Sequence, residues 1–240
     1  MPKLADLHNH TLYGLDDGAA DEACALQMLD ISYAQGVRAM CLTPHGDTMR
    51  FPYEKEKLLA HFEALSAHCR ERYPDLVLFL GNEIYGYIDS ADALAAGRFL
   101  PLGRSRVALV EFDRDVDFRK MCNVLQSYHA CGYQPMLAHA ERCFSLLKDE
   151  GRVRELVARR VRIQLNTSAF RRGFLPSRVN RFAYHMVEAG LVDVVATDAH
   201  GVTSRTPYML AAYQEVEKRY GGRVAEQLFY CNPLHILLGE

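Results

Sequence analysis

Short apolar runs alternate along the chain with longer amphipathic stretches. The runs are rich in Val, Leu and Ile on both faces, which is typical of parallel strands covered by helices. They predict seven strands, at 4–7, 37–43, 76–80, 106–110, 135–138, 161–165 and 192–196. The stretches between them have helical spacing, at 21–35, 53–72, 90–96, 115–130, 144–159, 176–189 and 207–238, the last interrupted at Gly221-Gly222 and Asn232-Pro233. No composition break or linker divides this alternation, so we expect one α/β domain over residues 1–240.

Side chains that can bind a metal stand where the apolar runs end. Such residues follow six of the seven predicted strands, and Asn166 follows the other. An open sheet concentrates its site between two or three strands at a switch point. A barrel brings the carboxyl end of every strand to one mouth. The spread of these residues around the whole chain therefore favours a barrel.

Nine residues share this placement. They are His8, His10, Asp17, His45, Glu83, Glu111, His139, Asp198 and His200. Residues two apart in an extended segment point the same way, so His8 and His10 can share one ion, and so can Asp198 and His200. Each residue taken alone also fits a loop, capping or packing role, but the common position favours a multinuclear metal site. The remaining histidines end no strand and are expected to be structural, namely His61, His68, His129, His185 and His235.

The charge of these nine residues, together with the ions they would hold, indicates which kind of substrate the site binds. Its four carboxylates would carry four negative charges; three divalent ions would leave the site positive and two would leave it neutral. A carboxylate-rich site with several cations suits hydrolysis of a phosphoester by a metal-activated hydroxide. Arg142 and Arg205 lie next to predicted ligands, and a guanidinium binds phosphate bidentately. A solvated surface charge is the alternative for either arginine, and Arg171 and Arg172 are weaker candidates.

Composition excludes several other classes of function. The formal net charge of −2 gives no footprint for nucleic acid or an anionic membrane. We see no secretory signal and no apolar stretch long enough for a membrane span. The seven cysteines are scattered without a C-x-x-C pair, which indicates reduced thiols and a cytoplasmic protein. No phosphate-binding P-loop or C-x5-R nucleophile motif occurs.

The segments that carry the candidate site also resemble a known family. They are Asp6-x-His8-x-His10, Asp16-Asp17-Gly18, Thr43-Pro44-His45, Gly81-x-Glu83, Glu111, His139-x-Glu141-Arg142 and Asp198-Ala199-His200. Their order is similar to that of the polymerase-and-histidinol-phosphatase (PHP) family, and most similar to the bacterial manganese-dependent protein-tyrosine phosphatases of capsule and exopolysaccharide operons. The resemblance covers nearly the whole chain. It implies a distorted TIM-like (β/α)7 barrel with a metal site at the C-terminal ends of the strands.

The resemblance further implies three divalent ions, Mn²⁺ first, with Fe or Zn as alternatives. One ion would be held by His8, His10, Glu83 and Asp198, a second by Glu83, Glu111 and His139, and a third by Asp17, His45 and His200. Arg142 and Arg205 match positions that assist phosphate binding and catalysis. The implied substrate is phosphotyrosine on a tyrosine autokinase that controls polysaccharide synthesis. Related proteins can assemble into rings, which leaves a homo-oligomer open.

Two segments, 46–52 and 166–173, depart from the form usual in that branch. They are expected to line the substrate mouth rather than to hold metal, so they bear on the choice of substrate. A small phosphomonoester such as histidinol phosphate or a nucleotide is the alternative substrate. An inactive regulatory barrel is the alternative from another class of function.

Overall fold

The structure is a computed structural model that describes residues 1–46, 49–170 and 177–240. All strand pairs among these residues are parallel. The strands are β1 (Leu4–Asn9), β2 (Val37–Leu42), β3 (His45–Gly46), β4 (Val77–Leu80), β5 (Glu83–Tyr85), β6 (Val107–Glu111), β7 (Gln134–Leu137), β8 (Arg162–Asn166) and β9 (Val194–Ala196). Each of the seven predicted strands is present.

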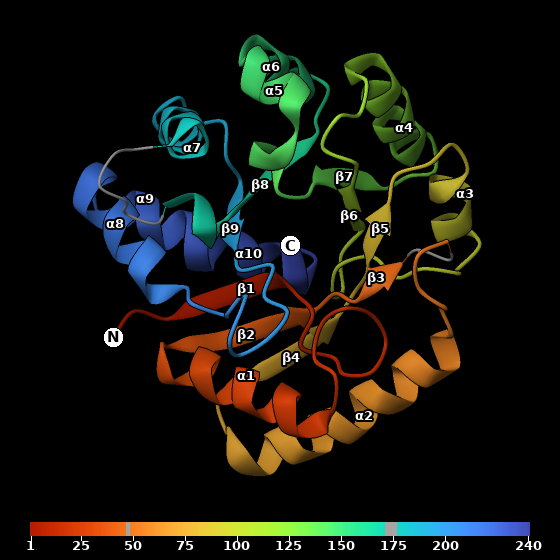
Figure 1. Cartoon of the computed structure of the whole chain (residues 1–240), viewed down its shortest axis with the longest axis vertical. Coiled ribbons are helices and arrows are strands. Elements are labelled where there is room, and N and C mark those ends of the chain that lie inside the picture. Colours follow the sequence, from red (N-terminus) through yellow and green to blue (C-terminus); the bar gives the residue numbers. More distant parts are fainter. Residues whose placement is uncertain (47–48, 171–176) are drawn as a thin grey trace.

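The strands curl into a distorted barrel (Figure 1). They form two sheets, in the orders β1-β2-β4 and β3-β5-β6-β7-β8-β9. Because β3 continues the chain from β2 and β5 continues it from β4, the two sheets are consecutive parts of one parallel layer. The layer closes where Asn9 bridges Ala199 and the Asp198 amide donates to the His8 carbonyl over 2.8 Å. The expected barrel is therefore confirmed.

The structure corrects two details of the strand prediction. The strands β3 and β5 were not predicted, because two and three residues are too few to produce an apolar run. The first strand is longer than predicted and extends to Asn9, so His8 lies inside β1 rather than after it. Both differences lie at the mouth of the barrel, where polar residues replace the apolar pattern.

Helices cover the outside of the barrel (Figure 1). They are α1 (Glu22–Ala34), α2 (Lys55–Arg72), α3 (Ser90–Ala95), α4 (Phe118–Ala130), α5 (Phe144–Lys148), α6 (Gly151–Ala158), α7 (Arg178–Glu188), α8 (Leu210–Tyr220), α9 (Gly222–Glu226) and α10 (Asn232–Leu238). Short 3-10 turns follow β7 (η1, Ala140–Arg142) and β8 (η2, Thr167–Phe170). Within the described ranges, no helix is long and apolar enough to cross a membrane.

The C-terminal region differs in one respect from its prediction. Gly221 ends α8 with a φ of 90°, as expected for a break. At Asn232-Pro233 the helix changes type instead of breaking, because a π-turn (η3, Gln227–Cys231) runs directly into α10. Pro233 stands in the first turn of α10, where its missing N–H leaves no hydrogen bond unmade.

Two apolar clusters explain why the strands are apolar on both faces. Along β6, Ala108 and Val110 belong to the cluster beneath the helices, whereas Val107 and Leu109 belong to a smaller cluster inside the barrel. Ile236 of α10 packs into that inner cluster. Apolar side chains therefore fill the inside of the barrel, and buried polar side chains gather where the strands end.

Candidate metal centre

The nine predicted ligands lie together at the carboxyl ends of the strands. Six come from or directly follow β1, β3, β5, β6 and β7, and the loop after β9 supplies Asp198 and His200. The ninth, Asp17, comes from the loop after β1 and has a half-exposed side chain. The structure therefore brings together the whole set that the sequence indicated, whereas the five histidines predicted to be structural all lie on helices.

The carboxylate of Glu83 lies at the middle of this set. Its Oε1 is 2.8 Å from His139 Nε2 and 3.2 Å from His8 Nε2. Its Oε2 is 3.2 Å from both His10 Nε2 and His45 Nδ1. Burial alone would raise the pKa of Glu83, but the surrounding imidazoles hold that pKa well below its usual range. A carboxylate that faces four imidazoles with both oxygens is placed to bridge two cations.

The other carboxylates extend the cluster in two directions. Asp198 Oδ1 is 3.5 Å from His8 Nε2 and 3.6 Å from His10 Nε2. Asp17 Oδ1 is 3.4 Å from His200 Nε2 and equally far from His45 Nε2. Glu83 therefore links two parts of the cluster. We call Asp198 with His8 and His10 the Asp198 corner, and His45 with Asp17 and His200 the His45 corner.

Glu111 completes the His45 corner. Its Oε1 is 3.1 Å from His45 Nδ1, and its Oε2 is 4.0 Å from His139 Nε2. Three overlapping groups each offer ligand atoms within 4.8 Å of one another. They are His10, Asp17, His45 and His200; His8, His10, Glu83 and Asp198; and His45, Glu83 and Glu111.

The hydrogen bonding of the imidazoles fits divalent cations. Among the described residues, the buried atoms His8 Nε2, His10 Nε2, His45 Nδ1 and His200 Nε2 have no hydrogen-bond partner. Buried polar atoms are otherwise nearly always satisfied in folded proteins. Each of these nitrogens nevertheless faces a carboxylate oxygen within 3.6 Å. Nitrogens and carboxylates arranged around a common space are the donor set that first-row divalent metals prefer.

A second layer of polar residues fixes the imidazoles and was not assigned from the sequence. Asp16 Oδ2 lies 2.7 Å from His10 Nδ1 and accepts a hydrogen bond from the His45 amide. Burial would lower the pKa of His10, but the Asp16 carboxylate outweighs that effect and raises it to about 9. Gly18 completes this turn because a Cβ there would lie 2.2 Å from the His10 carbonyl oxygen. The available signal was the Asp-Asp-Gly sequence, whose first carboxylate had no assigned role.

Gln164 and Asn166 form a comparable support on β8. Gln164 Oε1 lies 3.1 Å from His8 Nδ1 and accepts a hydrogen bond from the His139 amide. Its amide group donates to Asn166 Oδ1, and Asn166 Nδ2 donates to Asp198 Oδ2 over 2.8 Å. The predicted strand that carried no ligand therefore orients three of them. A buried polar residue inside an apolar strand was the signal in the sequence.

Both predicted arginines reach the Asp198 corner. Arg142 Nη2 is 2.6 Å from Asp198 Oδ2, and Arg205 Nη2 is 2.8 Å from Asp198 Oδ1. Their side chains are 31% and 38% exposed, so each guanidinium is accessible from the mouth. The other two candidates, Arg171 and Arg172, lie outside the described residues.

The backbone of the centre is held in an unusual conformation. His139, Asp198 and Arg205 have φ values of 34°, 52° and 46°. Residues with a Cβ rarely adopt this left-handed region, and it costs on the order of 1–3 kcal/mol each. Outside the centre, Arg160 is the only other described residue besides glycine with a positive φ. Strain gathered at one place indicates that the fold holds these side chains for function rather than for stability.

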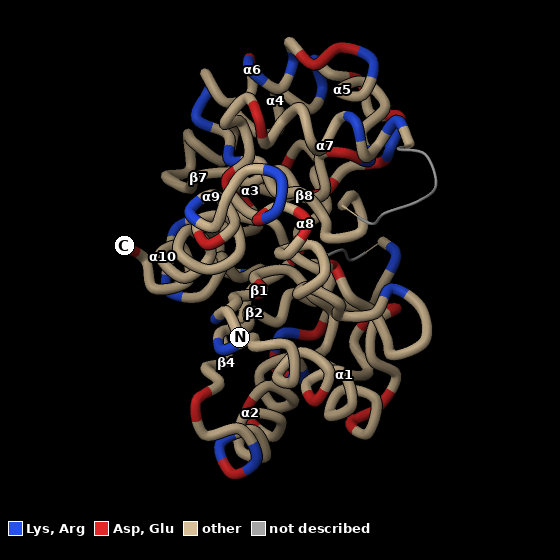
Figure 2. The backbone as a smooth tube through the Cα atoms, turned by 90° about the vertical axis from the view of Figure 1, so that its left-hand side faces the viewer, with Lys and Arg blue, Asp and Glu red and all other residues tan. Residues whose placement is uncertain are grey.

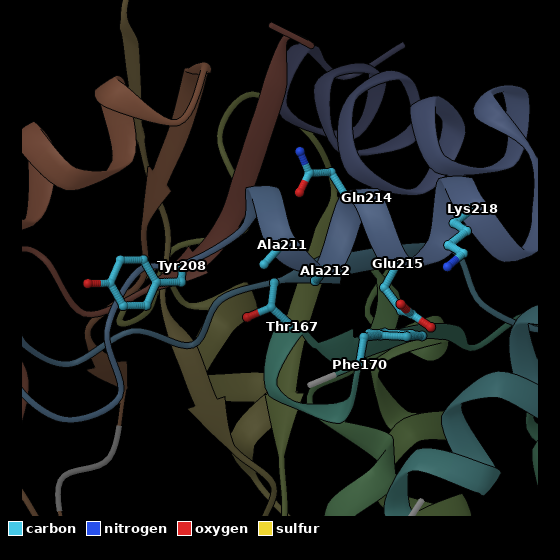
Figure 3. Close-up of a pocket in the computed structure, with 8 residues that line it drawn as sticks. All are labelled: Thr167, Phe170, Tyr208, Ala211, Ala212, Gln214, Glu215 and Lys218. Atoms are coloured by element: carbon cyan, nitrogen blue, oxygen red, sulfur yellow. The ribbon is translucent and has the colours of Figure 1, made fainter. Parts of the chain in front are cut away.

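A separate cavity of about 540 Å³ lies between η2 and α8. It is lined by Thr167, Phe170, Tyr208, Ala211, Ala212, Gln214, Glu215 and Lys218 (Figure 3). Tyr208 and Lys218 lie at opposite ends of this row, and none of the nine clustered residues lines it. On the outer helices, for example α2, acidic and basic side chains are interspersed (Figure 2). The concentration of buried charge at the mouth is therefore the feature that distinguishes this structure.

A parallel barrel whose strand ends converge on clustered imidazoles and carboxylates defines a class of metal-centre α/β barrel. In agreement, the structure of a phosphotriesterase homology protein from Escherichia coli has the same fold, with a TM-score of 0.61 at 12% identity over 98% of each chain. The model of the CpsB/CapC family of capsular polysaccharide synthesis matches residues 4–238. The chain belongs to this family, as the resemblance in its motifs predicted.

Two relatives support the assignment in detail. The tyrosine-protein phosphatase CpsB of Streptococcus pneumoniae is 33% identical over 99% of both chains. A structure from a study of YwqE of Bacillus subtilis and CpsB of S. pneumoniae, described as metal-dependent tyrosine phosphatases, superposes with a TM-score of 0.89. It is 26% identical and matches 99% of this chain and 95% of that one. The family, fold and length of these proteins all agree with the chain described above.

Proposed function

We propose that this protein is a metal-dependent phosphatase that hydrolyses phosphotyrosine on a protein. The observation that carries the proposal is the clustering of nine imidazoles and carboxylates at one mouth, with Glu83 in their middle and two arginines beside them. Two relatives that match 99% and 94% of the chain are named as tyrosine-protein phosphatases. Residues 1–240 would act as a single catalytic domain.

We assign the nine residues to three divalent ions. His8, His10, Glu83 and Asp198 would hold one ion, and Asp17, His45 and His200 a second. Glu83, Glu111 and His139 would hold a third, with Glu83 bridging. The first set is supported by the group His8, His10, Glu83 and Asp198, whose ligand atoms lie within 4.8 Å of one another. Asp17, His45 and His200 form a second such group together with His10. The third set is supported by His139 Nε2, which lies 2.8 Å from Glu83 Oε1 and 4.0 Å from Glu111 Oε2. Mn²⁺ is the ion we expect, and Fe or Zn would satisfy the same nitrogen and oxygen donors.

When bound, divalent cations supply a hydroxide nucleophile at neutral pH and neutralise charge on the phosphoryl group. The protein's own contribution is to position and to bind. Asp16 and Gln164 fix the imidazole planes of His10 and His8. Arg142 and Arg205 would bind the phosphoryl oxygens, since a planar guanidinium offers two parallel N–H donors to them. These donors are already placed before substrate arrives, so stabilising the transition state requires little reorganisation.

The names of the relatives and of the family support a proposed substrate and setting. A protein that carries phosphotyrosine, such as a tyrosine autokinase controlling capsular or exopolysaccharide synthesis, fits both the activity and the family description. The seven cysteines, all within the described residues, are unpaired in the structure. This supports a reducing compartment, and we place the protein in the cytoplasm. A homo-oligomer remains part of the same proposal and is tested by sedimentation.

Hydrolysis of a phosphotyrosine peptide by metal-replete protein tests this function. We expect Glu83→Gln and His139→Ala to lose more than about 100-fold in kcat/KM, because even changes behind metal ligands cost ~10–100-fold. His129→Ala is the matched control, since His129 is a half-buried residue of α4 that, among the described residues, hydrogen-bonds to the Arg159 carbonyl. Full activity of the two site variants would refute the mechanism.

The same assay separates the alternatives. A preference for histidinol phosphate or a nucleotide over the peptide would indicate a phosphatase of small molecules. Absence of both bound metal in elemental analysis and hydrolysis of any phosphoester would indicate an inactive regulatory barrel.

A further inference from the structure

Two consecutive side chains, Arg50 and Phe51, lie against the His45 corner of the metal centre. Arg50 Nη1 is 3.7 Å from Glu111 Oε1, the oxygen that is also 3.1 Å from His45 Nδ1. The Phe51 ring is stacked on the His45 ring, with centroids 5.0 Å apart and an interplanar angle of 6°. Both come from the segment that follows β3.

Arg50 is held in place by an aromatic residue and a carboxylate. Its guanidinium carbon lies 4.4 Å from the centre of the Tyr85 ring, and its Nη2 is 2.6 Å from Asp113 Oδ1. The Tyr85 hydroxyl donates to the other oxygen of Asp113 over 2.5 Å. The side chain is nevertheless 43% exposed. Arg50 is thus a partly exposed cation that Tyr85 and Asp113 hold at the rim.

The Phe51 side chain is apolar, unlike the imidazoles and carboxylates of the metal centre. It is an apolar ring, half-buried, beside a site made of imidazoles and carboxylates. A phenyl ring has no donor atom for a metal ion and none for a phosphoryl oxygen. It does offer a surface for another aromatic ring, and such pairs favour offset or edge-on contact. A neighbouring arginine adds a cation that attracts the face of the same ring.

Arg50 and Phe51 are separate from the two arginines that would bind the phosphoryl group, so they are available to contact another part of the substrate. Arg142 and Arg205 both contact Asp198, and Arg205 Nη1 also lies 3.7 Å from Asp17 Oδ2. A phosphoryl group held by those two guanidinium groups has its leaving group still to be accommodated. The only rim described at the His45 corner that combines an aromatic face with a fixed cation is the one formed by Phe51 and Arg50.

We propose that Arg50 and Phe51 recognise the aromatic ring of the phosphotyrosine leaving group and so determine specificity for tyrosine over aliphatic phosphoesters. This inference rests on the proposed phosphatase function and adds the residues that select its substrate. The role is binding of the ring, so it requires no change in the metal centre or in phosphoryl binding.

The test compares phosphotyrosine and phosphoserine peptides of the same sequence, with inhibition by inorganic phosphate as a third measurement. For Phe51→Ala and Arg50→Ala we expect kcat/KM on the phosphotyrosine peptide to fall ~2- to 10-fold relative to phosphoserine, as expected for loss of a ring contact. The inhibition constant of phosphate should stay within about twofold, because Arg142 and Arg205 still bind it. Phe51→Tyr should retain the preference, because it keeps the ring.

Two control variants test whether the effect depends on the location of Arg50 and Phe51 beside the metal centre. Arg106 lies 4.5 Å over the Tyr133 ring at the start of β6, whereas Glu111 ends that strand, so Arg106→Ala removes a similar pair at the other end of the barrel. Tyr208→Ala removes an exposed aromatic ring from the cavity in Figure 3. Neither should change the preference.

Three results would overturn the inference. An unchanged preference in both Phe51→Ala and Arg50→Ala would exclude a role in ring recognition. A parallel loss on both peptides together with weaker phosphate inhibition would show that the pair supports the metal centre instead. Loss of preference in Tyr208→Ala alone would place ring recognition in the other cavity. Failure of the unmodified protein to hydrolyse either peptide is a distinct outcome, since it rejects the proposed function itself.

Discussion

Asp16 Oδ2 lies 2.7 Å from His10 Nδ1 and thereby directs the other nitrogen of that imidazole toward Glu83 and Asp198. A carboxylate behind a histidine fixes both the tautomer and the plane of the ring, and it makes the ring a stronger ligand. The same Asp16 oxygen accepts a hydrogen bond from the amide of His45. One side chain that is not a proposed metal ligand therefore fixes the imidazole of His10 and the backbone of His45.

This relationship predicts the effect of Asp16→Asn. We expect metal affinity and kcat/KM to fall ~10- to 100-fold, with the fold intact, because the amide keeps an acceptor but loses the charge. Elemental analysis at limiting Mn²⁺ and the rate at saturating Mn²⁺ should separate the two effects, since excess metal should restore most of the rate. Asp21→Asn in the same loop is the control, because Asp21 caps α1 and asparagine caps equally well. Equal loss in both variants would contradict a specific role for Asp16.

The two arginines at Asp198 predict a separation between phosphate binding and metal binding. Arg142→Ala and Arg205→Ala should each lower kcat/KM by about 10²–10³, as for removal of a transition-state donor. Metal content should be unchanged, because arginine contributes no ligand atom. Arg152→Ala, which removes an exposed pair with Asp149, should be silent. Loss of bound metal in either site variant would show that the arginines act by neutralising Asp198.

Removal of metal should lower thermal stability. Ions that bind only the folded protein stabilise it by about 2.7 kcal/mol at 100 times their dissociation constant. For a chain of this size that corresponds to a rise of roughly 5–10 °C in Tm. Calorimetry of chelated protein before and after addition of Mn²⁺ measures the shift. We expect Glu83→Gln to lose most of it and His129→Ala to keep it; an equal shift in all three proteins would mean that the ions bind elsewhere.

Two neighbouring arginines after α6 provide a test of backbone strain away from the site. Arg160 has a φ of 60°, whereas Arg159 caps the helix with a φ of −84°. Arg160→Gly should raise the free energy of unfolding by ~0.5–1 kcal/mol, because glycine adopts the left-handed region without steric cost. Arg159→Gly should lower it by a similar amount. Urea unfolding gives both values, and stabilisation by both or by neither would argue against strain at Arg160.

Ring recognition, phosphate binding and metal binding are thus assigned to different residues of one mouth. The arginines proposed to bind phosphate contact Asp198, Glu83 links the proposed ions, and Phe51 stacks on His45. Variants at these three places should change different measurements, so the assignments can be rejected one at a time.

The sequence by itself determined seven of the strands and the nine candidate ligands. A strand that packs against the barrel interior on one face and against helices on the other must be apolar on both faces. Runs such as 106–110 can therefore be recognised in the sequence without knowledge of the fold. Where such a run ends, a histidine or carboxylate is conspicuous, and nine of them pointed to one mouth. The family resemblance rested on those same residues, and the family match over residues 4–238 confirms it.

Only the tertiary structure decided which residues stand behind and around the ligands. Gln164 contacts His8 across 156 positions of sequence, and that contact exists because closing the barrel brings β8 near β1. The short strands β3 and β5 arise from pairing with neighbours, so no local pattern announces them. The stacking of Phe51 on His45 likewise depends on the path of one irregular segment. Periodicity records what each element buries, whereas these contacts depend on where distant elements meet.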